Sequence, residues 1–250
     1  MSIAGVRKSY AGRVVLDVPQ LTAQAHRTLA LIGPSGCGKS TLLRIVIGLV
    51  GSDTGTVSFG GRPMERASRR ELRLGTGYVI QEGGLFPHLT VLGNVALVPR
   101  DLGWSEERIA ARVDELAELT RIPGELLRRY PHQLSGGQRQ RVALIRALVL
   151  DPAVLLMDEP LASLDPLIRS ELQDELRQLF ARLRKTVLLV THDLAEAAFL
   201  GDAIALFRDG RVVQVGTLDD LATRPAEPFV SSFIGAQRSL GLRLAYGGEP

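Results

Sequence analysis

The feature that most constrains this sequence is a glycine-rich loop between two apolar segments. Residues 33–40 read Gly-Pro-Ser-Gly-Cys-Gly-Lys-Ser and match the pattern G-x-x-x-x-G-K-[ST] at each specified position. Apolar residues 29–32 precede the loop and residues 42–47 follow it, which is the strand-to-helix context that the pattern requires. Glycines let such a loop fold back with its N–H groups pointing inward, and the helix N-terminus adds a positive end. The stretch therefore predicts a cradle for phosphate groups.

Three side chains of this cradle carry specific expectations. Lys39 is expected to reach the β- and γ-phosphates of a nucleotide, and the Ser40 hydroxyl to complete the oxygen coordination of Mg²⁺. Cys37 lies near Lys39 and the helix N-terminus, which favour a reactive thiolate. Maleimide is then expected to abolish turnover, with ATP protecting. The alternative is a small loop residue that tolerates modification.

Composition limits the kind of protein. With 250 residues and 45% hydrophobic content, the chain can form one large domain with an inserted subdomain, but not two cassettes. No apolar run reaches the roughly 18 residues of a membrane span, and the N-terminus has no signal core, so a cytoplasmic chain is expected. The single cysteine excludes an internal disulfide or a cysteine zinc site. A net charge of +3 from dispersed basic residues argues against nucleic acid as a partner.

Strand-like and helix-like segments alternate along much of the chain. Residues 89–150 have helical periodicity only, which predicts an all-helical insertion. Asp209-Gly210 lies between two strand-like runs and predicts a hairpin with a two-residue turn. The expected strands are 3–10, 14–18, 27–32, 56–59, 77–80, 154–159, 186–190, 203–207 and 211–215. The expected helices are 40–48, 64–72, 91–98, 106–119, 124–129, 138–150, 165–183, 218–222 and 229–234.

Polar residues stand at the ends of three expected strands, where α/β sheets place their ligands. Gln81 ends one apolar strand, and Asp158 and Glu159 end another that is apolar throughout. Buried acids are costly unless they meet a cation or a reacting group. Asp158 therefore suits a Mg²⁺ shell, and Glu159 suits a base beside the attacking water. His192 could contact a terminal phosphate. The alternatives are an ordinary strand terminus, a solvated acid pair and a structural histidine.

Two further features have both a functional and a structural reading. Leu-Ser-Gly-Gly-Gln at 134–138 opens a helix, with Ser135 as N-cap and two glycines that suit an anion, although such a run is also an ordinary loop. Tyr10 precedes the cradle and could stack on a purine, or could be a strand aromatic in the core.

These motifs, in this order, closely resemble the ATPase subunit of ABC transporters, and residues 134–138 resemble the signature of that family. The resemblance implies an α/β fold: a P-loop NTPase (RecA-like) core with an antiparallel β subdomain and an inserted α-helical signature subdomain. It places one ABC ATPase domain at 1–240, the helical subdomain at about 88–150 and a tail at 241–250. It also implies a head-to-tail dimer with two ATP molecules at the interface.

The resemblance assigns a role to each motif residue. Glu159 would be the catalytic base and His192 the γ-phosphate switch, assisted by Lys39 and Gln81. Asp165 would cross the dimer, and Ser135 and Gly137 would contact the γ-phosphate held by the other subunit. The implied metal ligands for Mg²⁺ are Ser40, Gln81 and Asp158. The implied ATP-binding set is Tyr10, Gly33, Pro34, Ser35, Gly36, Cys37, Gly38, Lys39, Ser40, Thr41, Ser135, Gly136, Gly137, Gln138 and Asp165.

The residues between the motifs resemble those of the ATPases of glycine betaine, choline and related quaternary-amine importers, notably at 78–90, 129–134, 164–169 and 191–197. Many of those ATPases continue into a pair of CBS domains, whereas this sequence stops at Pro250, so gating through such domains is not expected. Glu82 stands where they often carry glutamine. With 5% aromatic residues the chain is not expected to cage the solute itself, and a separate solute-binding protein would do so.

The implied partners are integral-membrane permease subunits that contact this chain near Gln81, and a second ATPase subunit in a homodimer or heterodimer. The chain would lie peripherally at the cytoplasmic face of the plasma membrane. The alternatives are a soluble or regulatory ABC ATPase of DNA repair, translation or cell division, and a transporter ATPase for another solute. A nucleotide kinase would leave residues 134–138 unexplained.

Overall fold

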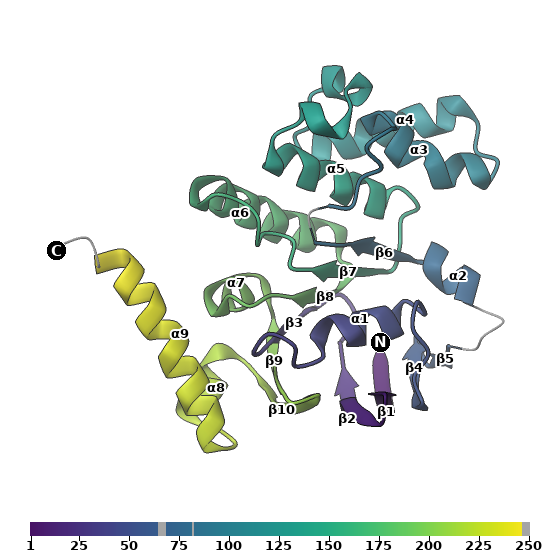
Figure 1. Ribbon diagram of the computed structural model, residues 1–250. Helices are drawn as coiled ribbons and strands as arrows, with labels where there is room; N and C mark the ends of the chain where they lie inside the picture. Colours follow the sequence, from purple (N-terminus) through teal and green to yellow (C-terminus); the bar gives the residue numbers. More distant parts are fainter. Residues whose placement is uncertain (65–68, 82, 247–250) are drawn as a thin grey trace. The chain divides into compact units, whose positions relative to one another are not determined.

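The computed structural model describes residues 1–64, 69–81 and 83–246, with side chains described as far as residue 237. The chain divides into two compact units, one formed by residues 1–64 with 188–250 and the other by residues 65–187. Figure 1 labels their helices and strands. No helix within the described ranges has the length and apolarity needed to cross a membrane.

The first unit contains an antiparallel sheet in the order β2-β1-β4-β5. Val6 lies opposite Val18 and Ile3 opposite Val57, and these four side chains are buried. Ile3 and Val6 are three residues apart, and the register of β1 with β4 shifts between Ala4 and Arg7, so the alternation of buried and exposed residues is interrupted there. The four strands are β1 (Ser2–Tyr10), β2 (Arg13–Thr22), β4 (Thr54–Phe59) and β5 (Arg62–Pro63).

The same unit contains a second group of strands, β3 (Thr28–Ile32), β9 (Ala203–Arg208) and β10 (Arg211–Gly216). β3 pairs in parallel with β9, and β9 pairs antiparallel with β10. Asp209 and Gly210 both have positive φ, 48° and 81°, as a type I′ turn requires, so the predicted hairpin is confirmed. Ala30 and Ile32 of β3 pack with helices α7 (Leu194–Leu200), α8 (Leu218–Thr223) and α9 (Pro228–Tyr246) in one apolar core.

The second unit is mainly helical around two parallel strands, β6 (Thr76–Val79) and β7 (Val154–Asp158). Helices α3, α4 and α5 lie together in Figure 1, and α5 packs against both α3 and β6. Its other elements are α2 (Arg69–Leu74), α3 (Val91–Asp101), α4 (Glu106–Leu119), η1 (Gly124–Arg128), η2 (Pro131–Gln133), α5 (Gly136–Leu148) and α6 (Pro166–Leu183). β8 (Thr186–Val190) begins in this unit and ends in the first.

Several expected boundaries are wrong for identifiable reasons. The predicted end of α3 at Val98 is too early, because the helix continues to Asp101 with Pro99 inside it, although proline cannot donate a backbone hydrogen bond. Residues 124–128 form a 3₁₀ helix, in which the Leu126 N–H donates to the carbonyl oxygen of Pro123 and the Arg129 N–H to that of Leu126. α7 and β5 were not anticipated. Part of the helix expected at 64–72 lies outside the described residues.

On the helix at 165–183 the sequence predicts one apolar stripe, formed by Leu167, Ile168, Leu172, Leu176, Leu179 and Leu183. Leu167 does not belong to the buried part of this helix. Its side chain is 70% exposed, whereas Leu172, Leu176 and Leu179 are buried. At 100° per residue, Leu167 lies about 140° around the helix from Leu172, so both cannot face the same core.

Candidate functional site

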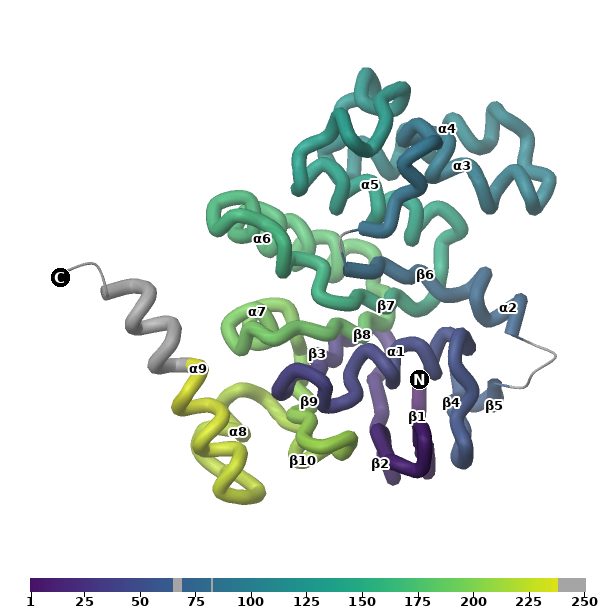
Figure 2. Tube along the Cα trace, viewed as in Figure 1, coloured from purple at the N-terminus to yellow at the C-terminus, as the bar shows by residue number. Residues whose placement is uncertain are grey.

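The glycine-rich loop connects β3 to α1 (Lys39–Val46), and the path of the chain through it can be followed in Figure 2. Lys39 is 6% exposed, and its Nζ donates hydrogen bonds to the carbonyl oxygens of Gly33, at 2.8 Å, and Pro34, at 3.0 Å. Among the described residues, no side chain caps the N-terminus of α1 at Gly38. A buried cation held by neutral carbonyls and an uncapped helix end together favour an anion at this loop.

Two glycines of the loop are required by close backbone contacts. A Cβ atom on Gly33 would lie 2.3 Å from the carbonyl oxygen of Phe207, and one on Gly38 would lie 2.8 Å from that of Val15. The Gly210 N–H also donates to the carbonyl oxygen of Cys37 at 3.1 Å. The loop is therefore supported by β2 and by the turn between β9 and β10.

Cys37 is buried, which changes the expectation for its chemistry. Its side chain is 4% exposed, and its Sγ lies 3.5 Å from Lys39 Nζ. Maleimide can reach such a thiol only when the loop opens, so we expect labelling of the native protein to be roughly tenfold or more slower than labelling in urea. Mass spectrometry of samples quenched at successive times measures both labelling rates. Saturating ATP should slow labelling of the native protein further. Equal rates in buffer and urea would contradict the burial.

Two other predicted residues of the first unit are exposed. Tyr10 is 50% exposed, with Lys8 Nζ 5.2 Å from its ring centroid, so the alternative that it is a core aromatic is wrong. His192 is exposed directly after β8. The next residue, Asp193, caps α7 by accepting hydrogen bonds from the N–H groups of Ala195 and Glu196. This cap fixes the backbone beside His192.

In the second unit, Gln81 and the acid pair follow neighbouring parallel strands. Val79 lies opposite Met157, so Gln81 and Glu159 follow at the same level of the same sheet edge. Asp158 is 8% exposed as the last residue of β7, and Gln81 is exposed. Glu159 has φ of 47°, a left-handed conformation that costs a non-glycine residue of order 1–3 kcal/mol. Strain of this kind occurs at functional sites, which fits the predicted role of Glu159.

The Leu-Ser-Gly-Gly-Gln stretch forms the predicted helix start. Ser135 Oγ accepts a hydrogen bond from the Gln138 N–H at 3.2 Å, and Gln138 Oε1 accepts one from the Ser135 N–H at 2.9 Å. This capping box confirms Ser135 as the N-cap of α5. Asp165 is likewise the N-cap of α6, where it accepts from the Ile168 N–H at 3.1 Å.

The glycines of this stretch also have a packing role that the sequence did not indicate. A Cβ atom on Gly137 would lie 2.7 Å from Ile168 Cγ2, and one on Gly136 would lie 3.1 Å from Leu164 Cδ2. The N-terminus of α5 therefore rests on the segment around Asp165. Arg141 of α5 adds a bidentate ion pair to Glu175 of α6, with distances of 2.8 and 3.0 Å.

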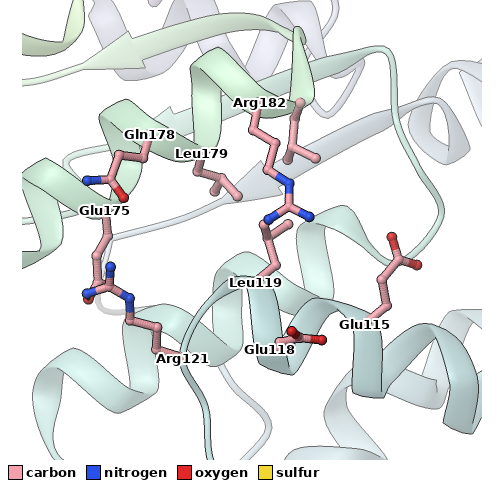
Figure 3. Close-up of a pocket in the computed structure, with 9 residues that line it drawn as sticks. Glu115, Glu118, Leu119, Arg121, Glu175, Gln178, Leu179 and Arg182 are labelled. Atoms are coloured by element: carbon pink, nitrogen blue, oxygen red, sulfur yellow. The ribbon is translucent and has the colours of Figure 1, made fainter.

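A cavity of about 330 Å³ lies between α4 and α6 (Figure 3). Leu119 of α4 faces Leu179 and Arg182 of α6 across it, and charged side chains of both signs surround them. Arg121 pairs with Glu175 at 3.3 Å on its wall. None of the residues lining this cavity belongs to the predicted nucleotide set. The cavity therefore lies apart from the residues that the sequence predicts for nucleotide binding.

Comparisons with known proteins agree with this geometry. A family model described as ABC transporter matches residues 16–162. A choline transport ATP-binding protein of Bacillus subtilis is 41% identical over 95% of this chain and 63% of its own length. A sulfate/thiosulfate import ATP-binding protein of Xanthomonas campestris is 45% identical over 98% of this chain and 72% of its own length. The chain spans 59% to 64% of the length of the choline, carnitine and osmoprotectant relatives.

Solved structures give the same result. An ATP-binding cassette solved as a dimer in a post-hydrolysis state, with ADP and Pi bound, has a TM-score of 0.77 and 32% sequence identity to this chain. The likeness covers 87% of this chain and 99% of that cassette. The matched family region includes the loop at 33–40, Gln81, residues 134–138 and the pair at 158–159.

Proposed function

This chain belongs to the ABC transporter family, and we propose from that membership that it hydrolyses ATP to drive solute uptake through a separate permease. The proposed solutes are quaternary amines of the glycine betaine and choline type. The observation that carries this proposal is the likeness to choline transport ATP-binding proteins over nearly the whole of this chain. The proposed cassette domain is 1–240, with its helical part at about 88–150.

The proposed nucleotide site uses the residues in the roles that the resemblance assigns. The loop at 33–40 and Lys39 would hold the phosphates, and Tyr10, half-exposed, would stack on the adenine. The proposed Mg²⁺ ligands are Ser40, Gln81 and Asp158. Their oxygen atoms are those that Mg²⁺ prefers, and the buried Asp158 carboxylate is of a kind that a cation stabilises. The metal would neutralise charge on the phosphates during transfer.

Glu159 is the proposed general base, which orients the attacking water and takes its proton. His192 is proposed to hydrogen-bond the γ-phosphate, since an exposed imidazole at a strand end can donate to an anion. Positioning and charge neutralisation supply most of the catalysis in phosphoryl transfer, so small displacements of these groups would control the rate.

The site is proposed to be complete only in a head-to-tail dimer. Ser135, Gly136 and Gly137 form the N-terminus of α5, which favours an anion such as the γ-phosphate held by a second subunit. ATP would then hold two subunits together, and hydrolysis would replace one bound anion by two that repel each other. Either a homodimer or a heterodimer satisfies this scheme.

The proposed membrane partner is a permease that docks near Gln81. The second unit exposes apolar side chains after β6 and on α3, with Phe86 43%, Leu97 45% and Val98 39% exposed. The chain would bind the permease at the cytoplasmic face, and a separate solute-binding protein would select the solute.

Uptake in the host organism tests the proposed solute. We expect deletion of the gene to abolish uptake of labelled glycine betaine or choline, and the wild-type gene to restore it. The gene carrying Lys39→Ala should not restore uptake, because the substitution removes the phosphate-binding ammonium. Unchanged quaternary-amine uptake in the deletion strain would reject the proposed solute.

A second solute class has its own support, because the sulfate/thiosulfate relative is as similar to this chain as the quaternary-amine relatives are. Labelled sulfate should therefore be measured in the same deletion strain. Loss of sulfate uptake with intact choline uptake would favour this alternative. Retention of both, with defects in DNA repair, translation or cell division, would favour a cassette that serves no transporter.

A further inference from the structure

Arg146, on the last turn of α5, contacts the chain segment that follows Gln81. Its Nη1 donates to the carbonyl oxygen of Gly84 and its Nη2 to that of Gly83, both at 2.8 Å. Its guanidinium carbon lies 6.0 Å from the centroid of the Phe86 ring. Because the guanidinium is rigid and planar, two such bonds fix the direction of both carbonyls.

The segment also lies directly against α5. A Cβ atom on Gly83 would lie 3.3 Å from Ala143 Cβ and 3.4 Å from the carbonyl oxygen of Arg139. The Gly83 N–H donates to the carbonyl oxygen of Ile80 at 3.0 Å, which closes a tight turn. The segment therefore cannot slide along α5 while Arg146 holds these carbonyls.

The other end of the segment is fastened to α3 by Asn94, which is 1% exposed. Asn94 Oδ1 accepts from the Phe86 N–H at 2.7 Å. Its Nδ2 lies within 3.1 Å of the carbonyl oxygens of Phe86, Leu89 and Thr90. Phe86 is thus held from two sides while 43% of it remains exposed.

Arg146 lies on the same continuous helix as the N-terminus of α5, so it moves when α5 moves. The helix begins at Gly136, about 15 Å from Arg146 at 1.5 Å per residue, and a continuous helix of this length moves as one body. Burial lowers the pKa of Arg146, but a guanidinium stays protonated in proteins. The two carbonyl oxygens therefore take the place of water in solvating its positive charge. Loss of either contact would leave a poorly solvated cation.

We propose that Arg146 is a positioning residue that transmits movement of the N-terminus of α5 to the segment Gly83–Phe86, in which Gly84 and Phe86 are exposed. Engagement of residues 135–137 with a nucleotide displaces α5, and the guanidinium carries Gly83, Gly84 and the adjoining Phe86 with it. The proposal rests on the proposed ATP-driven dimer, and it adds a specific side chain that connects nucleotide engagement to the surface proposed for the permease.

Hydrogen exchange measured by mass spectrometry tests this role without the permease. The parent is Glu159→Gln, which retains ATP, and it is compared with and without Mg-ATP. We expect ATP to slow exchange about fivefold or more in peptides covering 134–141 and 83–90, which corresponds to about 1 kcal/mol of added protection. Arg146→Lys and Arg146→Gln should keep the response at 134–141 and reduce that at 83–90 below about twofold.

Arg112 provides a matched control. It lies on α4, its side chain is 20% exposed, and it donates to the consecutive carbonyls of Leu148 and Val149 at 3.0 and 3.2 Å. Arg112→Gln should lower the melting temperature about as much as Arg146→Gln, yet retain the ATP response at 83–90. Arg146→Lys keeps a positive charge at this position, so it still tests the role of the guanidinium if the glutamine variant unfolds.

Three outcomes would overturn the proposal. The first is a full ATP response at 83–90 in both Arg146 variants, and the second is an equal loss in Arg112→Gln. The third is a parent that responds at 134–141 but not at 83–90. Absence of any response at 134–141 in the parent would instead reject the ATP-driven dimer, and the coupling with it. None of these four outcomes depends on which solute is transported.

Discussion

Replacement of Glu159 by glutamine is expected to reduce ATP turnover by about 10²- to 10⁴-fold, which is the usual contribution of a general base. The amide is nearly isosteric with the carboxylate but cannot accept the proton of the attacking water. Glu159 follows the buried end of β7 in a left-handed conformation, and the substitution leaves that backbone unchanged. Phosphate release at saturating Mg-ATP measures the loss.

The same variant should bind ATP and accumulate as a dimer, because only the chemical step is blocked. Size-exclusion chromatography with Mg-ATP distinguishes dimer from monomer. Glu171→Gln is the matched control, since Glu171 is an exposed carboxylate on α6, and its turnover should equal that of the wild type. A Glu159→Gln protein that hydrolyses ATP normally, or that stays monomeric with Mg-ATP, would contradict the assignment.

Replacement of Lys39 by alanine is expected to abolish nucleotide binding. The ammonium is the buried cation of the loop, and it also joins the carbonyls of Gly33 and Pro34 across the loop. ATP at about 100 times its Kd should stabilise the wild-type protein by about 2.7 kcal/mol, and this gain should vanish in the variant. Without nucleotide, loss of the two hydrogen bonds should lower stability by about 1–3 kcal/mol.

Thermal unfolding with and without Mg-ATP separates the two effects of this substitution. Lys185→Ala serves as the control, because Lys185 is 15% exposed and its Nζ lies 2.7 Å from Asp151, away from the loop in sequence. That variant should lose stability but keep the full ATP-dependent shift in melting temperature. A normal ATP-dependent shift in Lys39→Ala would show that the loop does not bind phosphate through this side chain.

Much of this arrangement follows from local sequence signals. The strands at 154–158 and 186–190 contain the apolar runs 154–157 and 187–190, which favour burial. Ser135 and Asp165 are N-caps because their oxygen atoms accept from N–H groups three residues later, an interaction confined to one turn. The α/β P-loop fold implied by the resemblance is confirmed by the likeness to solved cassettes.

The features that escaped prediction depend on residues distant in sequence. Gly137 meets Ile168, Arg141 meets Glu175, and Arg146 meets Gly83 only after the helices have packed. The residues next to an arginine in the sequence do not predict which carbonyl oxygen its side chain will contact. Leu167 shows the converse error, because its spacing predicted a place in the buried stripe whereas the structure exposes it to solvent.

The glycine-rich loop is supported by β9 and the turn after it. This support affects when the loop can form during synthesis of the chain. Thr28, at the start of β3, bonds the Asp202 side chain across 174 residues, and Gly33 and Cys37 rest on Phe207 and Gly210. The loop is synthesised early together with β2, yet its contacts with Phe207 and Gly210 form only after residues 203–210 have been synthesised. A nascent chain that ends at α7 already carries all the motifs named above but lacks the strand that holds the first of them in place. Contacts this distant in sequence form slowly, so we expect competence to bind nucleotide to arise only after β9 has been synthesised.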